Sequence, residues 1–417
     1  MADVTRQIGL SLGADLCWPL CFEKILDQLK PAVRVGGDTV RFSTERITIE
    51  PFDLQQPCRY DVVLDRLTHW YHTSREWIKK AVVMDGLYVL NNPWTLQSME
   101  KHTSYCAMMR LGLEVPRTFL VPPKSYEPAP DLQPTLERYA QMFDLGAIGN
   151  DLGYPLFLKP YAGGGWIGVN RATDEESLRK AYDESGVSLM HAQASVEGFD
   201  LFTRCVGIGP QIRYVDYDAS APLHDRYRVA GPDIDDEARG WLRRITLTIN
   251  SFFGWDFNSA EILRRQGHYH PIDFANACPD SQVTSLHYHF PWLVKAKLRW
   301  ALFCAATGRS FRHNLRWEEY FAIADSDASY EEKVAQYGAL GEKALDSARF
   351  EAFCHEQLPN LDEVAYEFFG SDEARDAVWQ KVKVLYPEHE VDEFTELFFS
   401  RIQLWRKREG EDKTIFR

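Results

Sequence analysis

A lysine in an apolar strand, followed by a glycine-rich segment, is the chain's most informative chemical pattern. Residues 157–169 read FLKPYAGGGWIGV, with Lys159 in the strand and Gly163, Gly164 and Gly165 in the turn. Glycines let backbone N–H groups approach an anion closely, and the lysine adds a mobile positive charge. The pattern predicts a flap over the phosphates of a nucleotide, although a plain hairpin turn would have the same composition.

A second pattern consists of two carboxylates and one amide. Residues 259–263 and 270–274 read as the two strands of a hairpin, with Gly267 near its turn. This pairing would bring Glu261 near Asp273 and Asn276 at one end of a sheet. Their oxygens form a hard ligand set that suits Mg²⁺. An edge hairpin with solvated acids is the alternative.

Two histidine pairs offer a different metal chemistry. His268 and His270, and likewise His287 and His289, would each share one face of an extended backbone. Zinc accepts two ligands at that spacing, but a closed site needs about four. Solvent is the simpler partner for His268, and the second pair could border a substrate pocket.

The elements that must position these residues fall into three expected domains. Residues 1–121 alternate short apolar strands with helices, and a helix from Asn92 towards Leu111 carries Lys101. A proline-rich loop follows, and strands dominate up to about residue 290. Residues 291–417 are helical, and the last helix has an apolar face at steps of three and four. That face contains Val391, Phe394, Phe398, Ile402 and Trp405. The predicted class is α/β (α+β), with domains 1–121, 122–290 and 291–417.

Composition excludes several classes of protein. The chain has 417 residues, 45% of them hydrophobic, and a net charge of −14. This charge argues against a broad nucleic-acid surface, which is normally basic. No apolar run approaches the roughly 20 residues of a membrane span. We therefore expect a cytoplasmic protein with neither a nucleic-acid nor a membrane partner.

Taken in order, these motifs resemble the ATP-grasp superfamily. The resemblance is strongest to its carboxylate–amine ligases, such as the D-alanine–D-alanine ligases and the amino-acid ligases that extend peptide ends. It covers roughly residues 87–279 and depends on motif order more than on any single motif. It implies an N-terminal α/β domain, an ATP-grasp region with lobes at about 122–195 and 196–290, and a C-terminal helical extension.

The resemblance also implies roles for individual residues. Lys101 and Lys159 would bind the ATP phosphates, beneath a flap formed by Gly163, Gly164 and Gly165. The adenine linker and the ribose acid would be Gln193, Ser195, Val196 and Asp200. The metal ligands would be Glu261, Asp273 and Asn276. Arg226 or Arg228, with Arg213 as a third candidate, would join Lys159 in stabilising the transferring phosphoryl group, unless each arginine pairs with a nearby aspartate.

One departure from the family pattern concerns the metal. Phe274 stands where such ligases usually have an acid, so Asp273 can serve only if a bulge or a longer spacing re-aims it. This puts a second metal ion in question more than the first.

The implied reaction uses ATP and Mg²⁺, with Mn²⁺ as an alternative, and joins a carboxylate to an amine through an acyl phosphate. The substrates would be small molecules or peptides, and a homodimer is left open. A small-molecule kinase of the same architecture and a nucleotide-binding scaffold without catalysis are the alternatives.

Overall fold

The computed structural model describes residues 3–48, 51–68, 70–95, 100–139, 143–276 and 278–410. The chain divides into two compact units, each assembled from separated segments. Unit 1 consists of Met1–Gln97, Phe202–Ala260 and Asn276–Arg417, and unit 2 of Ser98–Leu201 and Glu261–Ala275. Strands and helices mix throughout, with a helical C-terminal region, so the predicted α/β class is confirmed.

The first sheet of unit 1 has the strand order β2-β3-β1-β4-β5. β1 pairs in parallel with β3 and β4, β4 pairs in parallel with β5, and β2 is an antiparallel edge strand. Parallel neighbours need crossover connections, which helices commonly supply. The strands are β1 (Asp3–Ser11), β2 (Val33–Val35), β3 (Asp38–Arg46), β4 (Val62–Asp65) and β5 (Tyr88–Leu90), and the helices between them are α1 (Cys17–Leu29) and α2 (His72–Asp85).

Helix α9 (Phe290–Thr307) forms the centre of unit 1. It is buried from Phe290 to Ala306 and packs against α1, β1 and β4. The charged side chains of a helix enclosed on every side need polar partners. Lys295 and Arg299 pair with Asp362 of α13 (Leu361–Phe368), at 2.8 and 2.5 Å, and Lys297 donates to Ser281 Oγ at 3.1 Å.

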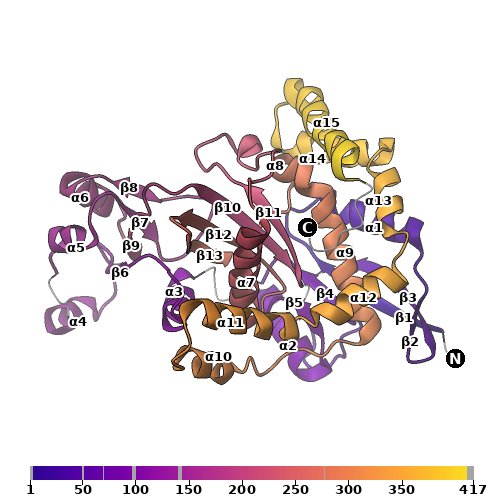
Figure 1. Cartoon of the computed structure of the whole chain (residues 1–417), viewed down its shortest axis with the longest axis horizontal. Coiled ribbons are helices and arrows are strands. Elements are labelled where there is room, and N and C mark those ends of the chain that lie inside the picture. The colour runs from indigo at the N-terminus through magenta and orange to yellow at the C-terminus, as the bar shows by residue number, and fades with distance from the viewer. Residues whose placement is uncertain are drawn as a thin grey trace. The chain divides into compact units, whose positions relative to one another are not determined.

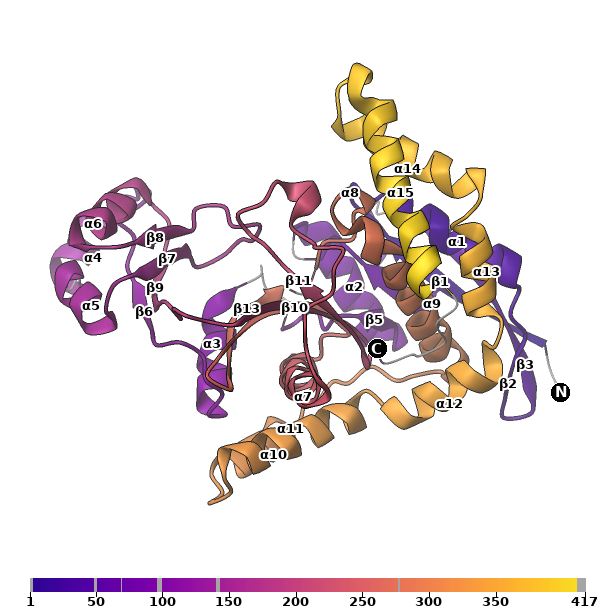
Figure 2. The same cartoon turned by 45° about the horizontal axis from the view of Figure 1, so that its top comes forward.

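Most of the remaining elements of unit 1 are helices, as expected beyond residue 291. Helix α7 (Asp236–Phe253) packs against α11 (Tyr330–Ala344), and the two lie next to each other in Figures 1 and 2. These helices approach closely because Gly341 of α11 faces Leu247, and a Cβ there would come within 2.9 Å of Leu247 Cβ. The others are η1 (Leu223–Asp225), α8 (Val283–Leu286), η2 (His287–His289), α10 (Trp317–Ala324), α12 (Ser347–Gln357), α14 (Asp372–Leu385), η3 (Glu388–Glu390) and α15 (Val391–Glu409).

A second sheet has the order β11-β10-β12-β13, which makes β13 an edge strand. Its strands are β10 (Leu201–Ile208), β11 (Gln211–Asp216), β12 (Phe257–Arg265) and β13 (His268–Asn276). Gln266 and Gly267, with φ of 52° and 83°, connect β12 to β13. Positive φ at both turn residues suits a two-residue hairpin loop. The predicted hairpin is confirmed.

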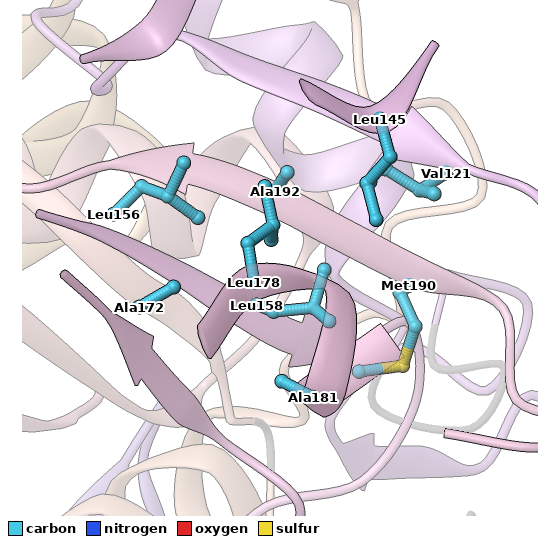
Figure 3. Packing of buried hydrophobic residues seen from close by; sticks show 9 residues of the cluster. All are labelled: Val121, Leu145, Leu156, Leu158, Ala172, Leu178, Ala181, Met190 and Ala192. Atoms are coloured by element: carbon cyan, nitrogen blue, oxygen red, sulfur yellow. The ribbon is translucent and has the colours of Figure 1, made fainter. Parts of the chain in front are cut away.

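Unit 2 contains a small sheet in the order β6-β9-β7-β8. All its pairings are antiparallel. Helices α5 and α6 pack on this sheet, and Leu145, Leu178 and Ala181 from these helices meet Leu158 and Ala192 of the strands (Figure 3). The elements of unit 2 are α3 (Lys101–Arg110), β6 (Thr118–Val121), α4 (Leu132–Tyr139), α5 (Leu145–Leu152), β7 (Leu156–Pro160), β8 (Asn170–Ala172), α6 (Glu175–Glu184) and β9 (Met190–Ala194).

One helix start differs from the prediction. Residues 93–95 form a turn, in which the side chain of Asn92 accepts a hydrogen bond from Trp94 N at 2.9 Å. Helix α3 begins at Lys101, and residues 96–99 lie outside the described part. Asparagine in the capping position can therefore close a turn without starting a helix.

Within the ranges given above, no helix is both long enough and apolar enough to cross a membrane.

Candidate active site

Lys159 lies near the end of β7 with its side chain inside unit 2. The residue is 6% exposed, and its Nζ donates to Gln193 Oε1 at 2.6 Å and to Ile272 O at 3.2 Å. Burial lowers the pKa of the ammonium from 10.5 to about 8, against the opposing effect of Asp273 and Glu261. These two acceptors of the ammonium, an amide oxygen and a backbone carbonyl, are both uncharged.

An edge strand explains how Lys159 finds a backbone acceptor. Because β13 ends its sheet, carbonyl groups on its outer side have no partner strand. Ile272 O instead accepts hydrogen bonds from Lys159 and from Tyr105 Oη of α3, the latter at 2.8 Å. Burial, followed by Asp273 and Glu261, raises the pKa of Tyr105 well above its usual value, so its hydroxyl stays a donor.

Lys101 connects the start of α3 to the glycine-rich segment. Its Nζ donates to Gly163 O at 2.6 Å and lies 3.8 Å from Asp273 Oδ2, and its backbone N donates to Tyr161 O at 3.2 Å. The residue is 5% exposed. A second buried ammonium thus lies in unit 2 within reach of a carboxylate.

The glycine-rich segment has backbone angles that side chains rarely adopt. Gly163 and Gly165 have φ of 108° and 69°, and a Cβ at either would meet nothing within 4 Å. Glycine is therefore needed here for conformation and not for space. Trp166, with φ of 66°, packs edge-on against Phe157 at 6.4 Å, so its ring lies against the strand that carries Lys159.

Both lysines, both carboxylates and the glycine-rich segment line one pocket of unit 2. Its lining consists of Lys101, Phe157, Lys159, Pro160, Ala162, Gly163, Gly164, Trp166, Ile167, Val169, Glu261, Ile272 and Asp273. Consecutive residues of a regular strand point to opposite faces, yet Ile272 and Asp273 both contribute. Along β13, buried and more exposed residues alternate up to Ile272, and the alternation ends there because Ile272 and Asp273 are both partly buried. Asp273 therefore shares the pocket with Glu261 despite its shifted position.

The donor set of this pocket fits a divalent cation that arrives with phosphates. Two carboxylates supply hard oxygen ligands, and two ammonium groups supply charge for phosphate oxygens. The third expected ligand, Asn276, belongs to unit 1, where its Nδ2 donates to Ser259 Oγ at 2.9 Å. In the described part of the chain, no three His, Cys, Asp or Glu side chains form a metal cluster.

The expected adenine and ribose residues have other contacts. Gln193 is buried, and its side-chain oxygen accepts a hydrogen bond from Lys159 Nζ. Ser195 and Val196 follow β9, and Ser195 Oγ donates to Glu197. Asp200 is exposed and pairs with Arg264 at 3.1 Å.

The three candidate arginines belong to unit 1. Arg226 Nε donates to Ala221 O at 3.0 Å, and Arg228 pairs with Asp218. Arg213 makes two bonds to Glu409, at 2.7 and 2.8 Å. Of these three arginines, Arg228 therefore pairs with a nearby aspartate, which was the alternative interpretation.

The four histidines considered for zinc have protein partners. His268 Nδ1 lies 2.7 Å from Glu114 Oε1, and His270 Nδ1 lies 3.0 Å from Glu114 O. His287 Nε2 and His289 Nε2 contact the carbonyls of His224 and Arg228. Three of the four rings thus bond to backbone carbonyls, and the fourth bonds to a carboxylate.

A group of aromatic rings beside Lys159 was not anticipated. His191, opposite Lys159 on β9, stacks on His102 with ring centroids 5.6 Å apart and on Tyr161 at 6.0 Å. Burial, then His102, Lys101 and Lys159, lower the pKa of His191 to about 4, so the ring is neutral. Sequence spacing holds no signal for this group, because its members come from three separate segments.

A curated protein is similar in sequence to part of this chain. No protein-family model matches the chain. A curated D-alanine–D-alanine ligase from Cupriavidus pinatubonensis is 30% identical over 101 residues, which cover 22% of this chain. The match spans 31% of that ligase, less than a third of its length.

Several solved structures are also similar to this chain. A RimK domain ATP-grasp protein from Sphaerobacter thermophilus has a TM-score of 0.48 and 13% identity, with 71% of this chain and 99% of that one covered. The VanG D-Ala:D-Ser ligase from Enterococcus faecalis has a TM-score of 0.45 and 14% identity, with 72% and 99% covered. The D-alanine–D-alanine ligase from Bacillus anthracis complexed with ATP has a TM-score of 0.46 and 13% identity, with 72% and 97% covered.

The chain is similar to ATP-grasp proteins. The resemblance expected from the sequence is confirmed at this level. One fold can host many activities, so the chemistry of this chain depends on its own residues.

Proposed function

We propose that this protein is an ATP- and Mg²⁺-dependent ligase that joins a carboxylate to an amine. The observation that carries the proposal is the pocket of unit 2, in which Lys101 and Lys159 share a lining with Glu261 and Asp273 beside a glycine-rich segment. Buried ammonium groups and paired carboxylates are what phosphoryl transfer requires, since it depends on charge stabilisation and positioning.

Glu261 and Asp273 would hold the divalent cation, which supplies charge to the terminal phosphates when bound. The two lysines neutralise phosphate oxygens, and their burial strengthens that interaction. The glycine-rich segment, with Gly163 tied to Lys101, closes over the nucleotide and excludes water. Arg226 and Arg228 stay the proposed stabilisers of further negative charge.

The proposed chemistry has two balanced steps. An oxygen of the carboxylate forms a bond to the γ-phosphorus as the bond from that phosphorus to the bridging oxygen of ADP breaks. The amine nitrogen then attacks the acyl carbon, phosphate leaves, and the nitrogen loses a proton. Water must be kept out because it would hydrolyse the acyl phosphate.

Turnover by the purified protein tests the proposal. Mg-ATP is supplied with mixtures of amino acids and peptides, and ADP, phosphate and any new amide are measured. D-alanine is included first, because the curated relative is named a D-alanine–D-alanine ligase. Amide with released phosphate supports the ligase, a stable phosphoester indicates a kinase, and tight nucleotide binding without turnover indicates a scaffold.

Three variants test the pocket itself. Lys159→Ala and Glu261→Ala are each expected to reduce turnover by about 10²-fold or more, as loss of a group that stabilises transition-state charge does. Asp151→Asn is the matched control, because Asp151 forms an exposed ion pair with Arg117. Rates like those of the unmodified protein in both pocket variants would contradict the assignment.

A further inference from the structure

The segment 217–231, here called the arginine loop, carries Arg226 and Arg228 and folds back on itself. Tyr217 and Tyr227 form an isolated β-bridge at its base. Asp218 N donates to Arg226 O at 2.9 Å, and Arg228 N donates to Asp216 O at the same distance. These bonds close the base of the loop but do not fix its tip.

A residue of strand β10 also stabilises the base of the arginine loop. The guanidinium of Arg204 lies 4.6 Å from the ring centroid of Tyr217, and its Nη1 donates to Tyr227 Oη at 2.8 Å. A cation over one ring and a hydrogen bond to the other hold both tyrosines in place.

The tip of the loop is held from the C-terminal helix α15. Arg401 donates from Nη1 to His224 O at 2.6 Å and from Nη2 to Asp225 Oδ1 at 2.7 Å. Phe394, also on α15, packs edge-on against the ring of His224 at 5.6 Å. A planar guanidinium with two fixed donors restricts both the backbone and the side chain it binds. The loop and Arg401 are 177 residues apart in sequence, so this contact is purely tertiary.

A second connection runs from the end of α15 to Arg228. Glu409 receives two hydrogen bonds from Arg213, whose Nε donates to His289 Nδ1 at 3.1 Å. An imidazole that accepts at Nδ1 must carry its proton at Nε2, and His289 Nε2 lies 2.9 Å from Arg228 O. Burial, followed by Arg213, lowers the pKa of His289 well below its usual value, which agrees with this neutral tautomer.

His287 repeats the arrangement at the tip. Its Nδ1 accepts from Tyr288 N at 2.7 Å, so Nε2 donates to His224 O, at 3.1 Å. The residue has φ of 28°, which side-chain-bearing residues rarely adopt. A residue with such a backbone conformation persists only where surrounding contacts hold it. Such residues cluster at functional sites.

We propose that helix α15 positions the arginine loop for turnover, with Arg401 and Glu409 as the positioning residues. Two separate hydrogen-bonded routes from this one helix end on the carbonyls of His224 and Arg228, on either side of Arg226, which gives the C-terminal helical region a defined role. The catalytic part of this inference rests on the proposed function, whereas the restraint of the loop does not.

Hydrogen exchange of the full-length protein tests the restraint. Arg401→Gln should raise amide exchange in peptides spanning 217–231 by roughly tenfold, because the charge-assisted bonds at the tip are lost. Arg375→Gln is the matched control, since it removes another arginine ion pair to α15, the exposed pair with Glu396. Exchange within α15 and the midpoint of thermal unfolding should match the unmodified protein in the control.

Kinetics separate positioning from simple destabilisation. With Mg-ATP and the substrates that support turnover, Arg401→Gln should lower kcat about tenfold and leave the KM for ATP unchanged. Arg401→Lys, which keeps one charged donor, should recover part of the rate. Glu409→Gln tests the second route, because it removes the charge of Glu409 and keeps the shape of the side chain. Amide exchange around Arg228 is expected to rise in this variant.

Each outcome has a distinct meaning. Unchanged exchange of the loop in both Arg401→Gln and Glu409→Gln overturns the restraint. Faster exchange with an unchanged kcat overturns the positioning role. An unmodified protein without turnover overturns the proposed function and with it the catalytic role, while exchange still decides whether α15 restrains the loop.

Discussion

The ammonium of Lys159 donates to the amide oxygen of Gln193, and Gln193 in turn donates from Nε2 to Thr118 Oγ1 at 2.9 Å. These residues come from the adjacent strands β7, β9 and β6. The donor and acceptor ends of the amide are thus both used, which fixes its orientation. Because the amide is uncharged, it holds the lysine in place without neutralising it.

The pH dependence of nucleotide affinity should follow Lys159. Its pKa of about 8 means that the side chain is a cation below pH 8 and loses its charge as pH rises further. Affinity for a non-hydrolysable ATP analogue should therefore fall between pH 8 and 10, by up to about tenfold per unit. Isothermal titration at pH 9 in buffers of different ionisation enthalpy should show proton uptake. Lys159→Arg should remove that uptake, because arginine stays charged; equal affinity at pH 7 and 9.5 in the unmodified protein contradicts the prediction.

Replacing Gln193 should shift that titration. Gln193→Leu removes an acceptor for the charged lysine, so the pKa of Lys159 should fall by about one unit, the equivalent of one hydrogen bond to a charged group. The decline in affinity would then begin at lower pH. Thr118→Val leaves the Gln193 oxygen in place and should cause a smaller shift, measured by the same titration. A larger effect of the threonine variant would refute this order of importance.

Gly163→Ala should impair the flap. At φ of 108° a Cβ is strained, although open space surrounds it, and the carbonyl that Lys101 binds would move. Turnover and analogue affinity should both fall. Gly112→Ala is the control: Gly112 has φ of 80° and equal space outside the pocket, so it should cost about 1 to 2 kcal/mol of stability without changing affinity.

Leu158→Ala should destabilise unit 2. Leu158 is fully buried in the cluster of Figure 3, between the sheet and helices α5 and α6. Removing its side chain should lower the free energy of unfolding by about 2 to 5 kcal/mol, measured by urea denaturation. Leu120→Ala, at a position 42% exposed, should stay within about 0.5 kcal/mol of the unmodified protein. Equal losses in the two variants would show that this cluster does not dominate the stability of unit 2.

Local pattern was enough to predict several elements of the site. The apolar strand of Lys159, the glycines at 163–165 and the hairpin around Gly267 each depend on neighbours in sequence. The helical face of Val391, Phe398, Ile402 and Trp405 was also readable, because 3.6-residue periodicity is a local property, and these residues are buried in α15. The start of α3 was not readable, since Asn92 closes a turn instead.

Sequence alone therefore determined the residue types, the order of the motifs and the resemblance that follows from them. Only the tertiary structure decided which groups meet: Gln193 with Lys159, Ile272 O with Tyr105, and Arg401 with the arginine loop. The reason is physical. Strand register and helix docking are set by packing between distant segments, and a shift of one residue in β9 would turn Gln193 to the other face of its sheet.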